Sequence, residues 1–428
     1  MTFGRYRSIL AIGPFRQFWL AFTASVLGDA ITRVALTWYV YERTGSARAV
    51  GWLMVCYTGP ILIGGLAAGA LLDRFDRRLV MAVDNLVRGL AVGMVPVLHL
   101  TGQLQIWQVY VVAACYGLLM MVSLAGGPSL VPDLVGEDDL ATANALEMLS
   151  FTVAGVIGPP LAGLLIALTA APNVIALDCL SYLIFGSVLI SQFRNGPARA
   201  DAANRTAAGY TLADAVRLTR RTPVLLSTTL MFTAFNIGNG CVLVALPVLA
   251  REGLHGGATL YGVLLGALAA GEVISSLTVG GLRFRPPLGI LICLAQILSG
   301  AAVSILLKQH IAVALVGLGL FGLCSAPLTI WAQTLRMQVI PAQLRGRTFA
   351  LLRTIMQGGG PIGGAIAGVL LPAIGLSAVV ALAAGAIGLP GFAGLNVRGL
   401  RGADQQSAAE PETALLIDGA AIEEATSC

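Results

Sequence analysis

Apolar runs of about twenty residues recur along this chain from residue 18 to residue 396. A helix of that length crosses the ~30 Å hydrocarbon core of a bilayer, at a rise of about 1.5 Å per residue. Lipid offers the backbone no hydrogen-bond partner, so a spanning run has to be helical. Charged residues make up only 11% of the chain, against about 25% in soluble domains. The sequence therefore predicts an all-α integral membrane protein.

The runs number twelve, and each predicts one transmembrane helix. The first is too long for the apolar core of a signal peptide, so we expect the mature protein to retain it. Prolines and glycines inside the runs are tolerated because neighbouring helices satisfy the freed backbone groups. The predicted helices are residues 18–40, 49–72, 79–100, 105–131, 141–170, 172–193, 224–250, 259–282, 286–307, 309–335, 347–371 and 374–396.

Basic residues are distributed unevenly between the loops. If the N-terminus is cytoplasmic, twenty of the twenty-six lysines and arginines fall on the cytoplasmic side, and Arg33 and Arg88 fall within helices. The outer side receives only Arg43, Arg48, Arg251 and Lys308. Basic loops stay inside, so this bias predicts two cytoplasmic termini and supports the number of helices. Heavy use of Ala, Gly and Arg indicates a bacterial gene, so we expect the inner (plasma) membrane.

A polar segment, residues 194–223, divides the helices six and six. The sequence GPPLAG at 158–163 in helix five is echoed by GPIGG at 360–364 in helix eleven, about two hundred residues further on. Internal repeats of this kind are typical of transporters. We therefore predict an N-terminal six-helix bundle (1–193), a cytoplasmic linker (194–223), a C-terminal six-helix bundle (224–396) and an acidic, disordered cytoplasmic tail (397–428).

Two motifs resemble those of the major facilitator superfamily. Residues 69–78, GALLDRFDRR, are similar to its G-x-x-x-D-R-x-G-R-R/K signature, except that Asp76 replaces a glycine. Residues 154–163 are similar to the G-x-x-x-G-P-x-x-G-G motif of drug/proton antiporters, with alanine replacing two glycines. VPDLV at 131–135, ANAL at 143–146 and Gly28-Asp29 resemble the drug and siderophore exporter branch. The resemblance implies a fold of two six-helix pseudo-repeats and export driven by the proton gradient, with no cofactor.

The resemblance also implies roles for these motifs. In the first, Asp73 is expected to pair with Arg77 or Arg78 or to cap helix three, and so to latch the cytoplasmic gate. The alternative is that the arginines only set topology. In the second, glycines permit close helix approach and prolines bend the helix, either for gating or for packing alone. The expected motif residues are Gly69, Asp73, Arg74, Arg77 and Arg78 in the gate, and Gly158, Pro159 and Gly163 in helix five.

Ionisable residues at membrane depth indicate the functional site, because each charge there costs about 2.5–3.5 kcal/mol even on the mildest scale. They are Asp29, Arg33, Asp84, Arg88, Glu147, Asp178 and Glu272. Asp29/Arg33 and Asp84/Arg88 are spaced i, i+4 with the acid first, the favourable order for a pair within one helix. Such pairs either serve transport or simply neutralise themselves.

Asp29 and Glu272 lie closest to the predicted midplane, one in each half. Glu272 has no cation on its own helix, so we expect it to carry the transported proton, with Asp29 held ionised by Arg33 or released when substrate competes for Arg33. Asn236 and Asn239 of helix seven are expected to bind substrate through hydrogen bonds. Ordinary bonding between helices is their alternative.

Other functions lack their residues in this sequence. The seven cysteines and three histidines show no metal-ligand spacing, and no nucleotide-binding or hydrolase motif occurs. The basic residues are spread over loops rather than clustered with aromatics, which argues against nucleic-acid binding. We therefore expect no enzyme activity and no bound metal.

The sequence predicts a proton-coupled exporter of small amphipathic molecules (drugs, antibiotics or siderophores) that works by alternating access. Its partners are expected to be the substrate and the lipid bilayer, and it is expected to act as a monomer. Two alternatives stay open. One is a transporter of the same fold for a lysolipid or an imported metabolite. The other is a membrane receptor or scaffold without transport, which would gain nothing from buried carboxylates.

Overall fold

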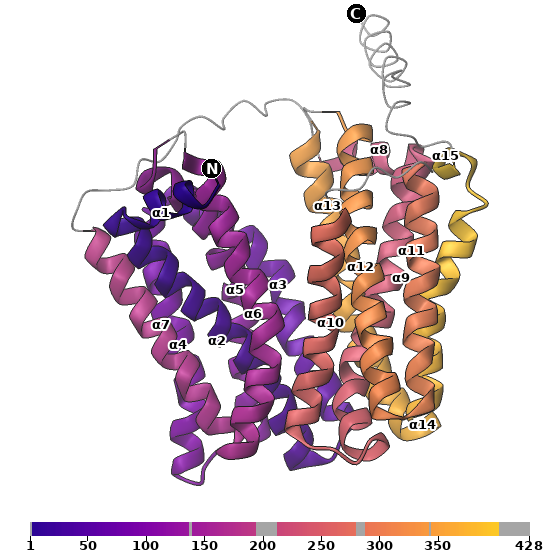
Figure 1. Ribbon diagram of the computed structural model, residues 1–428, viewed down its shortest axis with the longest axis horizontal. Coiled ribbons are helices and arrows are strands. Elements are labelled where there is room, and N and C mark those ends of the chain that lie inside the picture. Colours follow the sequence, from indigo (N-terminus) through magenta and orange to yellow (C-terminus); the bar gives the residue numbers. More distant parts are fainter. Residues whose placement is uncertain (1, 137–138, 194–211, 280–286, 342–343, 402–428) are drawn as a thin grey trace, which may run out of the picture.

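A computed structural model describes residues 2–136, 139–193, 212–279, 287–341 and 344–401, and within them every regular element is a helix. The helices run side by side in two groups (Figure 1). The first group is α1 (Thr2–Leu10), α2 (Gly13–Thr44), α3 (Ala47–Arg74), α4 (Arg77–Leu100), α5 (Ile106–Leu134), α6 (Leu140–Leu168) and α7 (Ala171–Phe193). The second is α8 (Leu212–Arg221), α9 (Pro223–Val248), α10 (Ala258–Val279), α11 (Leu288–Ser304), α12 (Ile311–Val339), α13 (Arg345–Gln357), α14 (Gly359–Gly394) and α15 (Arg398–Arg401).

Among the described residues, eleven helical stretches are long and apolar enough to span a membrane. The last of them, Leu351–Gly394, has 44 residues and would measure about 66 Å if straight, twice the hydrocarbon thickness. Its helical backbone breaks at Gly375, where φ is 81° and ψ is 169°, so the chain turns back there. This stretch therefore crosses twice, which confirms the twelve predicted spans.

Parts of the predicted linker and tail are folded. In α8, Ala215 and Leu218 are buried while the basic side chains face solvent, and Leu218 packs with Leu225, Ile340 and Leu352. The predicted linker thus contains a helix over residues 212–221, and residues 194–211 lie outside the described part of the chain. The predicted disorder is wrong for α15, whose Leu400 is 1% exposed, and residues 402–428 are not described. Helix α1 was not predicted, since it lies before the first apolar run.

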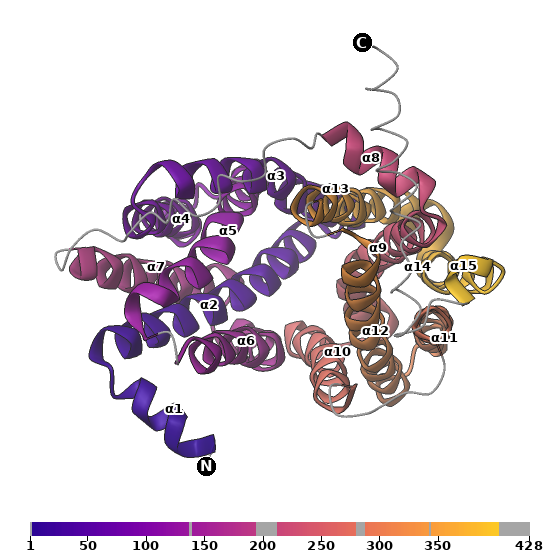
Figure 2. The ribbon, with the colours of Figure 1, turned by 90° about the horizontal axis from the view of Figure 1, so that it is seen from above.

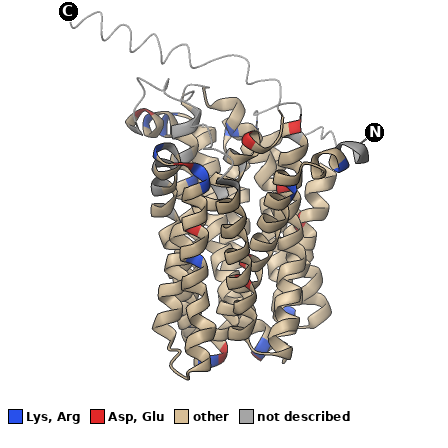
Figure 3. Ribbon diagram, turned by 90° about the vertical axis from the view of Figure 1, so that its left-hand side faces the viewer, with Lys and Arg blue, Asp and Glu red and all other residues tan. Residues whose placement is uncertain are grey.

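The two ends of the bundle differ in chemistry. We call the end that carries the Arg74–Arg78 turn, α8 and α15 the basic end (Figure 3). At the opposite end each of the six turns contains one residue with positive φ. These residues are Gly45, Gly102, Ala170, His255, Gln309 and Gly375. The turns of the opposite end are therefore tight, and little chain lies beyond the helices there.

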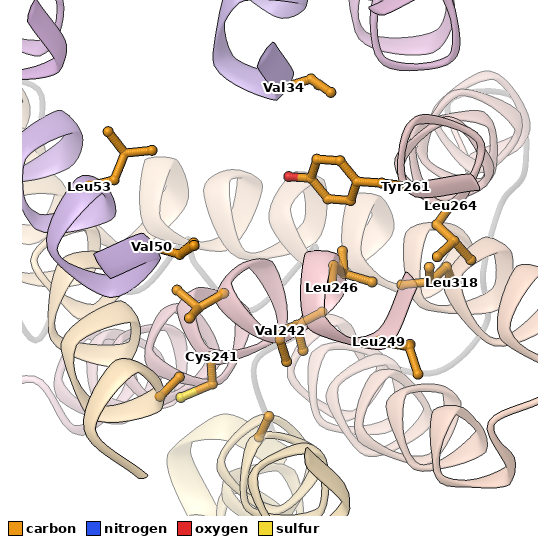
Figure 4. Packing of buried hydrophobic residues seen from close by; sticks show 14 of the residues in the cluster. Val34, Val50, Leu53, Cys241, Val242, Leu246, Leu249, Tyr261, Leu264 and Leu318 are labelled. Carbon is orange, nitrogen blue, oxygen red and sulfur yellow. The ribbon is translucent and has the colours of Figure 1, made fainter. Parts of the chain in front are cut away.

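The two halves touch near the opposite end through close contacts between helices. Helix α3 packs on α14, and α6 packs on α10. A Cβ atom on Gly51 of α3 would lie 2.7 Å from the carbonyl oxygen of Gly364 in α14, so only glycine permits this approach. Figure 4 shows Val50 of α3 beside Cys241 of α9, within one apolar cluster shared by both halves. Toward the basic end the two groups of helices diverge (Figure 1).

The outer surface of the bundle is strongly apolar. Large side chains such as Leu100, Leu277 and Ile63 are 80%, 78% and 68% exposed. A soluble monomer rarely exposes contiguous apolar surface on this scale. The exposed surface therefore fits contact with lipid.

Candidate site for proton coupling and substrate binding

A buried arginine organises the polar centre of the first half. Arg88 of α4 is 1% exposed, and its Nη2 donates a 2.6 Å hydrogen bond to Oδ2 of Asp84 one turn earlier. The same Asp84 oxygen accepts a 2.9 Å bond from the hydroxyl of Ser123 on α5. The guanidinium also lies over the ring of Tyr182, 4.6 Å from its centroid. The structure thus forms the Asp84–Arg88 pair that the spacing predicted.

Asp29 joins this network from α2. Its Oδ1 lies 3.7 Å from Nη1 of Arg88 and accepts a hydrogen bond from the Tyr182 hydroxyl of α7. The expected ion pair between Asp29 and Arg33 does not form, because packing of α7 against both α2 and α4 brings Arg88 to Asp29 instead. The Asp29 side chain is 22% exposed. It is therefore the point at which the network is accessible to solvent.

Asp178 of α7 completes the network from an inaccessible position. Its exposure is 0%, and it interacts electrostatically with Asp29 and Arg88. Oδ1 accepts a 3.1 Å bond from Ser181, while Oδ2 has no hydrogen-bond partner among the described residues. A Cβ atom on Gly28 would lie 2.2 Å from Oδ1, so the glycine makes room for this carboxyl. Asp178 was counted among the charges at membrane depth but was left out of the predicted site.

Arg33 and Glu272 are exposed ionisable residues on opposite halves of the molecule. Both side chains are exposed although each lies well inside its helix, Arg33 on α2 and Glu272 on α10. They interact electrostatically, which places them on the two sides of the space between the halves. Glu272 accepts a 3.4 Å hydrogen bond from Ser325 of α12. Figure 2 shows α10 next to α6 and close to α2, seen along the bundle.

The two predicted asparagines of α9 are half-buried. The amide of Asn236 donates to the carbonyl oxygen of Phe232 in its own helix at 2.9 Å, a local bond that leaves its amide oxygen available. No side-chain bond of Asn239 occurs within the described residues. A role for either in substrate binding stays a prediction.

The turn between α3 and α4 is capped by a different acid from the predicted one. Oδ1 of Asp76 accepts hydrogen bonds from the backbone N–H groups of Arg78 and Leu79, at 2.9 and 3.2 Å, and so caps α4. This explains how an aspartate fits where the family motif has glycine, since it is a preferred N-cap residue. Gly69 and Asp73 lie in α3, but the side chain of Asp73 is not among those that the structure describes. Arg74 is exposed and Arg78 is buried at this turn.

The motif at residues 154–163, predicted in the fifth spanning helix, lies in α6. Its glycines pack α6 against helices of both halves. A Cβ atom on Gly158 would lie 2.6 Å from Cβ of Ala30 in α2, within the first half. A Cβ atom on Gly163 would lie 2.4 Å from the carbonyl oxygen of Ala258 in α10, which belongs to the other half. A Cβ atom on Gly262 of α10 would lie 2.2 Å from the carbonyl oxygen of Pro159 in α6. The glycines therefore set the contact that holds the halves together.

Aromatic and charged residues close the opposite end. The Tyr41 hydroxyl at the end of α2 donates a hydrogen bond to Glu252, and Arg251 lies over the Tyr41 ring, 5.8 Å from its centroid. Trp38 of α2 stacks on Tyr261 of α10 with centroids 5.9 Å apart. Sequence reasoning missed these residues because the contacts join segments more than two hundred positions apart.

Removing the Tyr41 hydroxyl tests whether this contact holds the end closed. A Tyr41→Phe variant loses one hydrogen bond to a carboxylate, worth about 1.5–3 kcal/mol, but keeps the buried ring. We expect faster amide hydrogen exchange at the ends of α2 and α10 near these residues, measured by mass spectrometry on protein in detergent. Unchanged exchange there would show that the bond does not hold the end closed.

Two six-helix groups that meet at one end define a transporter with the major facilitator fold. Solved structures share it: the nucleoside transporter NupG aligns with a TM-score of 0.67 and 13% identity over 90% of this chain and 98% of its own. A bacterial homologue of the iron transporter ferroportin in an inward-facing state aligns with a TM-score of 0.66 and 17% identity over 89% and 98%. Residues 7–418 match the family model described as transmembrane secretion effector. The chain belongs to that family of the major facilitator superfamily and is a transporter, not an enzyme.

Curated relatives cover most of the chain. The multidrug efflux pump Tap of Mycolicibacterium fortuitum is 26% identical over 86% of this chain and 91% of its own. The enterobactin exporter EntS of Salmonella typhi is 27% identical over 84% and 86%. Macrolide efflux protein A of Streptococcus pyogenes is 23% identical over 85% and 90%. The chain is thus similar to exporters of chemically different molecules.

Proposed function

We propose that this protein exports small amphipathic molecules in exchange for protons, by alternating access of the space between its halves. The observation that carries the proposal is the surplus of acids over cations at the junction of α2, α4 and α7. Asp29, Asp84 and Asp178 meet there with one buried arginine, Arg88. An unpaired carboxylate taken out of water loses several kcal/mol of solvation, so such a group binds a proton instead.

The hydrogen bonds indicate which acid carries the proton. Asp84 already has a cationic partner, Arg88, at 2.6 Å, so it is not the carrier that we propose. Asp178 has no ion pair within the described residues, accepts a hydrogen bond from Ser181, and lies beyond the reach of solvent. Asp29 is partly exposed and interacts with both Arg88 and Asp178. A proton that enters from between the halves therefore reaches Asp29 first and Asp178 second.

The direction of transport follows from orientation. With the basic end in the cytoplasm, as the positive-inside rule requires, both termini are cytoplasmic and the space between the halves faces the cytoplasm. The names of Tap, EntS and macrolide efflux protein A support export. Substrate then enters from the cytoplasm near Arg33 and Glu272, and rocking of the halves exposes it to the other side.

An Asp178→Asn variant tests proton coupling. We expect it to lose proton-driven transport, at least tenfold, because it removes the proton carrier, while substrate exchange without a gradient continues. The measurement uses proteoliposomes with an internal pH-sensitive dye and a panel of a macrolide, ethidium and a catechol siderophore. Asp178→Glu, which keeps a titratable group, is the control and should retain part of the coupling. Full coupling in Asp178→Asn would exclude this carrier, and substrate uptake rather than efflux would favour an importer.

A further inference from the structure

We propose that Arg33 binds an anionic group of the substrate, a carboxylate or an ionised phenol. This inference rests on the proposed function, because it names the substrate chemistry that the space between the halves accepts. It predicts an anionic substrate, whereas the carboxylates at membrane depth taken alone would suggest a cationic amphipathic one.

Arg33 is an accessible cation without a local partner. Within the described residues its guanidinium makes no hydrogen bond or ion pair. The acid one turn earlier, Asp29, is already engaged by Arg88 and Tyr182. Arginine stays charged in proteins, and a charge at membrane depth normally has a partner. The partner missing here can be supplied by a molecule that enters between the halves.

The groups around Arg33 do not supply the missing negative charge. Arg33 interacts electrostatically with the hydroxyls of Tyr57, Tyr116 and Tyr261. Tyr57 and Tyr116 stack with centroids 5.1 Å apart, and Tyr261 stacks on Trp38, so these rings are packed against one another. A phenol carries no charge at neutral pH, so the tyrosines do not neutralise the guanidinium. A carboxylate or an ionised phenol matches the guanidinium fork and can do so.

The negative charge of Glu272 determines the direction in which probe affinity should change in each variant. It lies on the second half and interacts with Arg33 electrostatically, without a direct ion pair among the described residues. Its charge repels an anion bound to Arg33 and attracts a cation. Loss of this charge in Glu272→Gln should therefore tighten binding of an anion and weaken binding of a cation. Loss of the positive charge in Arg33→Gln should weaken binding of an anion and tighten binding of a cation.

Binding of three pyrene probes to the full-length protein in detergent tests the assignment at pH 7. The probes are 1-pyrenebutyrate, 1-pyrenebutanol and 1-pyrenemethylammonium, which share the ring but carry an anion, no charge or a cation. Energy transfer from tryptophan to pyrene reports the bound fraction. We expect wild-type protein to bind the butyrate about tenfold or more tightly than the butanol, as one charge-assisted bond provides.

The variants decide the outcome. Arg33→Gln should remove the preference for the butyrate without changing affinity for the butanol, and Arg33→Lys should keep part of it. Arg43→Gln, at the end of the same helix, is the matched control and should bind all three probes like wild type. A preference that survives Arg33→Gln, or a wild-type preference for the ammonium, would overturn the assignment. Because binding needs no proton gradient, this result is independent of whether transport is coupled to protons.

Discussion

The free energy of unfolding of an Arg88→Met variant is expected to be about 3–5 kcal/mol lower than that of the wild-type protein, because the variant leaves buried carboxylates without their cation. Methionine fills much of the same volume, so the loss reports charge rather than packing. Arg88 contacts Asp84, Ser123 and Tyr182 and lies near Asp29, so three helices lose a shared partner. Denaturation in mixed micelles, followed by circular dichroism, measures the change.

A double variant identifies the origin of that loss. Asp84→Asn combined with Arg88→Met removes one acid together with the cation, so the pair should be less destabilised than the two single changes added together. Strict additivity would show that Asp84 and Arg88 do not interact energetically. Transport should stay impaired in the double variant, because Asp29 and Asp178 still lack the arginine that tunes them.

Gly163→Val should shift the protein toward the conformation that is open at the opposite end. The new side chain would begin 2.4 Å from the carbonyl oxygen of Ala258, a contact that backbone atoms cannot relieve without moving α6 away from α10. Spin labels on the exposed residues Thr169 and His255, one in each half, measure how far apart the two halves lie at the opposite end. We expect the longer distance to dominate, together with at least a tenfold loss of transport.

Gly64→Val separates this effect from general damage. Its Cβ atom would lie 1.9 Å from the carbonyl oxygen of Leu118, an even closer contact than at Gly163 but within the first half. We expect that variant to lose stability while the distance between the labels stays at its wild-type value. The same shift in both variants would mean that the contact between α6 and α10 does not determine the conformation.

The sequence alone predicts the helices well, because a spanning helix is encoded in one continuous apolar run. The ends of a spanning helix are harder to predict. The first span is predicted as 18–40, but the helix extends over Gly13–Thr44, because polar residues can continue a helix beyond the hydrocarbon. Gly45, with φ of 59°, ends it, and a glycine after the last apolar residue is a signal that could have been used.

The site was predictable only where one helix contains both partners. Asp84 and Arg88 follow from their spacing, whereas the contact of Asp29 with Arg88 depends on how α7 packs between α2 and α4. From the sequence, Glu272 is the expected proton carrier because of its depth and the lack of a cation on its own helix, whereas the proposal of Asp178 rests on contacts that the sequence does not reveal. A carboxyl with one unsatisfied oxygen at 0% exposure is recognisable only in three dimensions.

The glycine contacts between the halves have an energetic consequence. Where Gly51 meets Gly364 and Gly163 meets Ala258, the facing surfaces are mostly backbone, so separating them removes few apolar side chains from one another. The free-energy difference between the two conformations can then be small. About 5.5 kcal/mol of differential binding is enough to reverse a population from 1:99 to 99:1. Under the proposed mechanism, glycine contacts of this kind would let the binding of one proton and one ligand reverse the conformational preference.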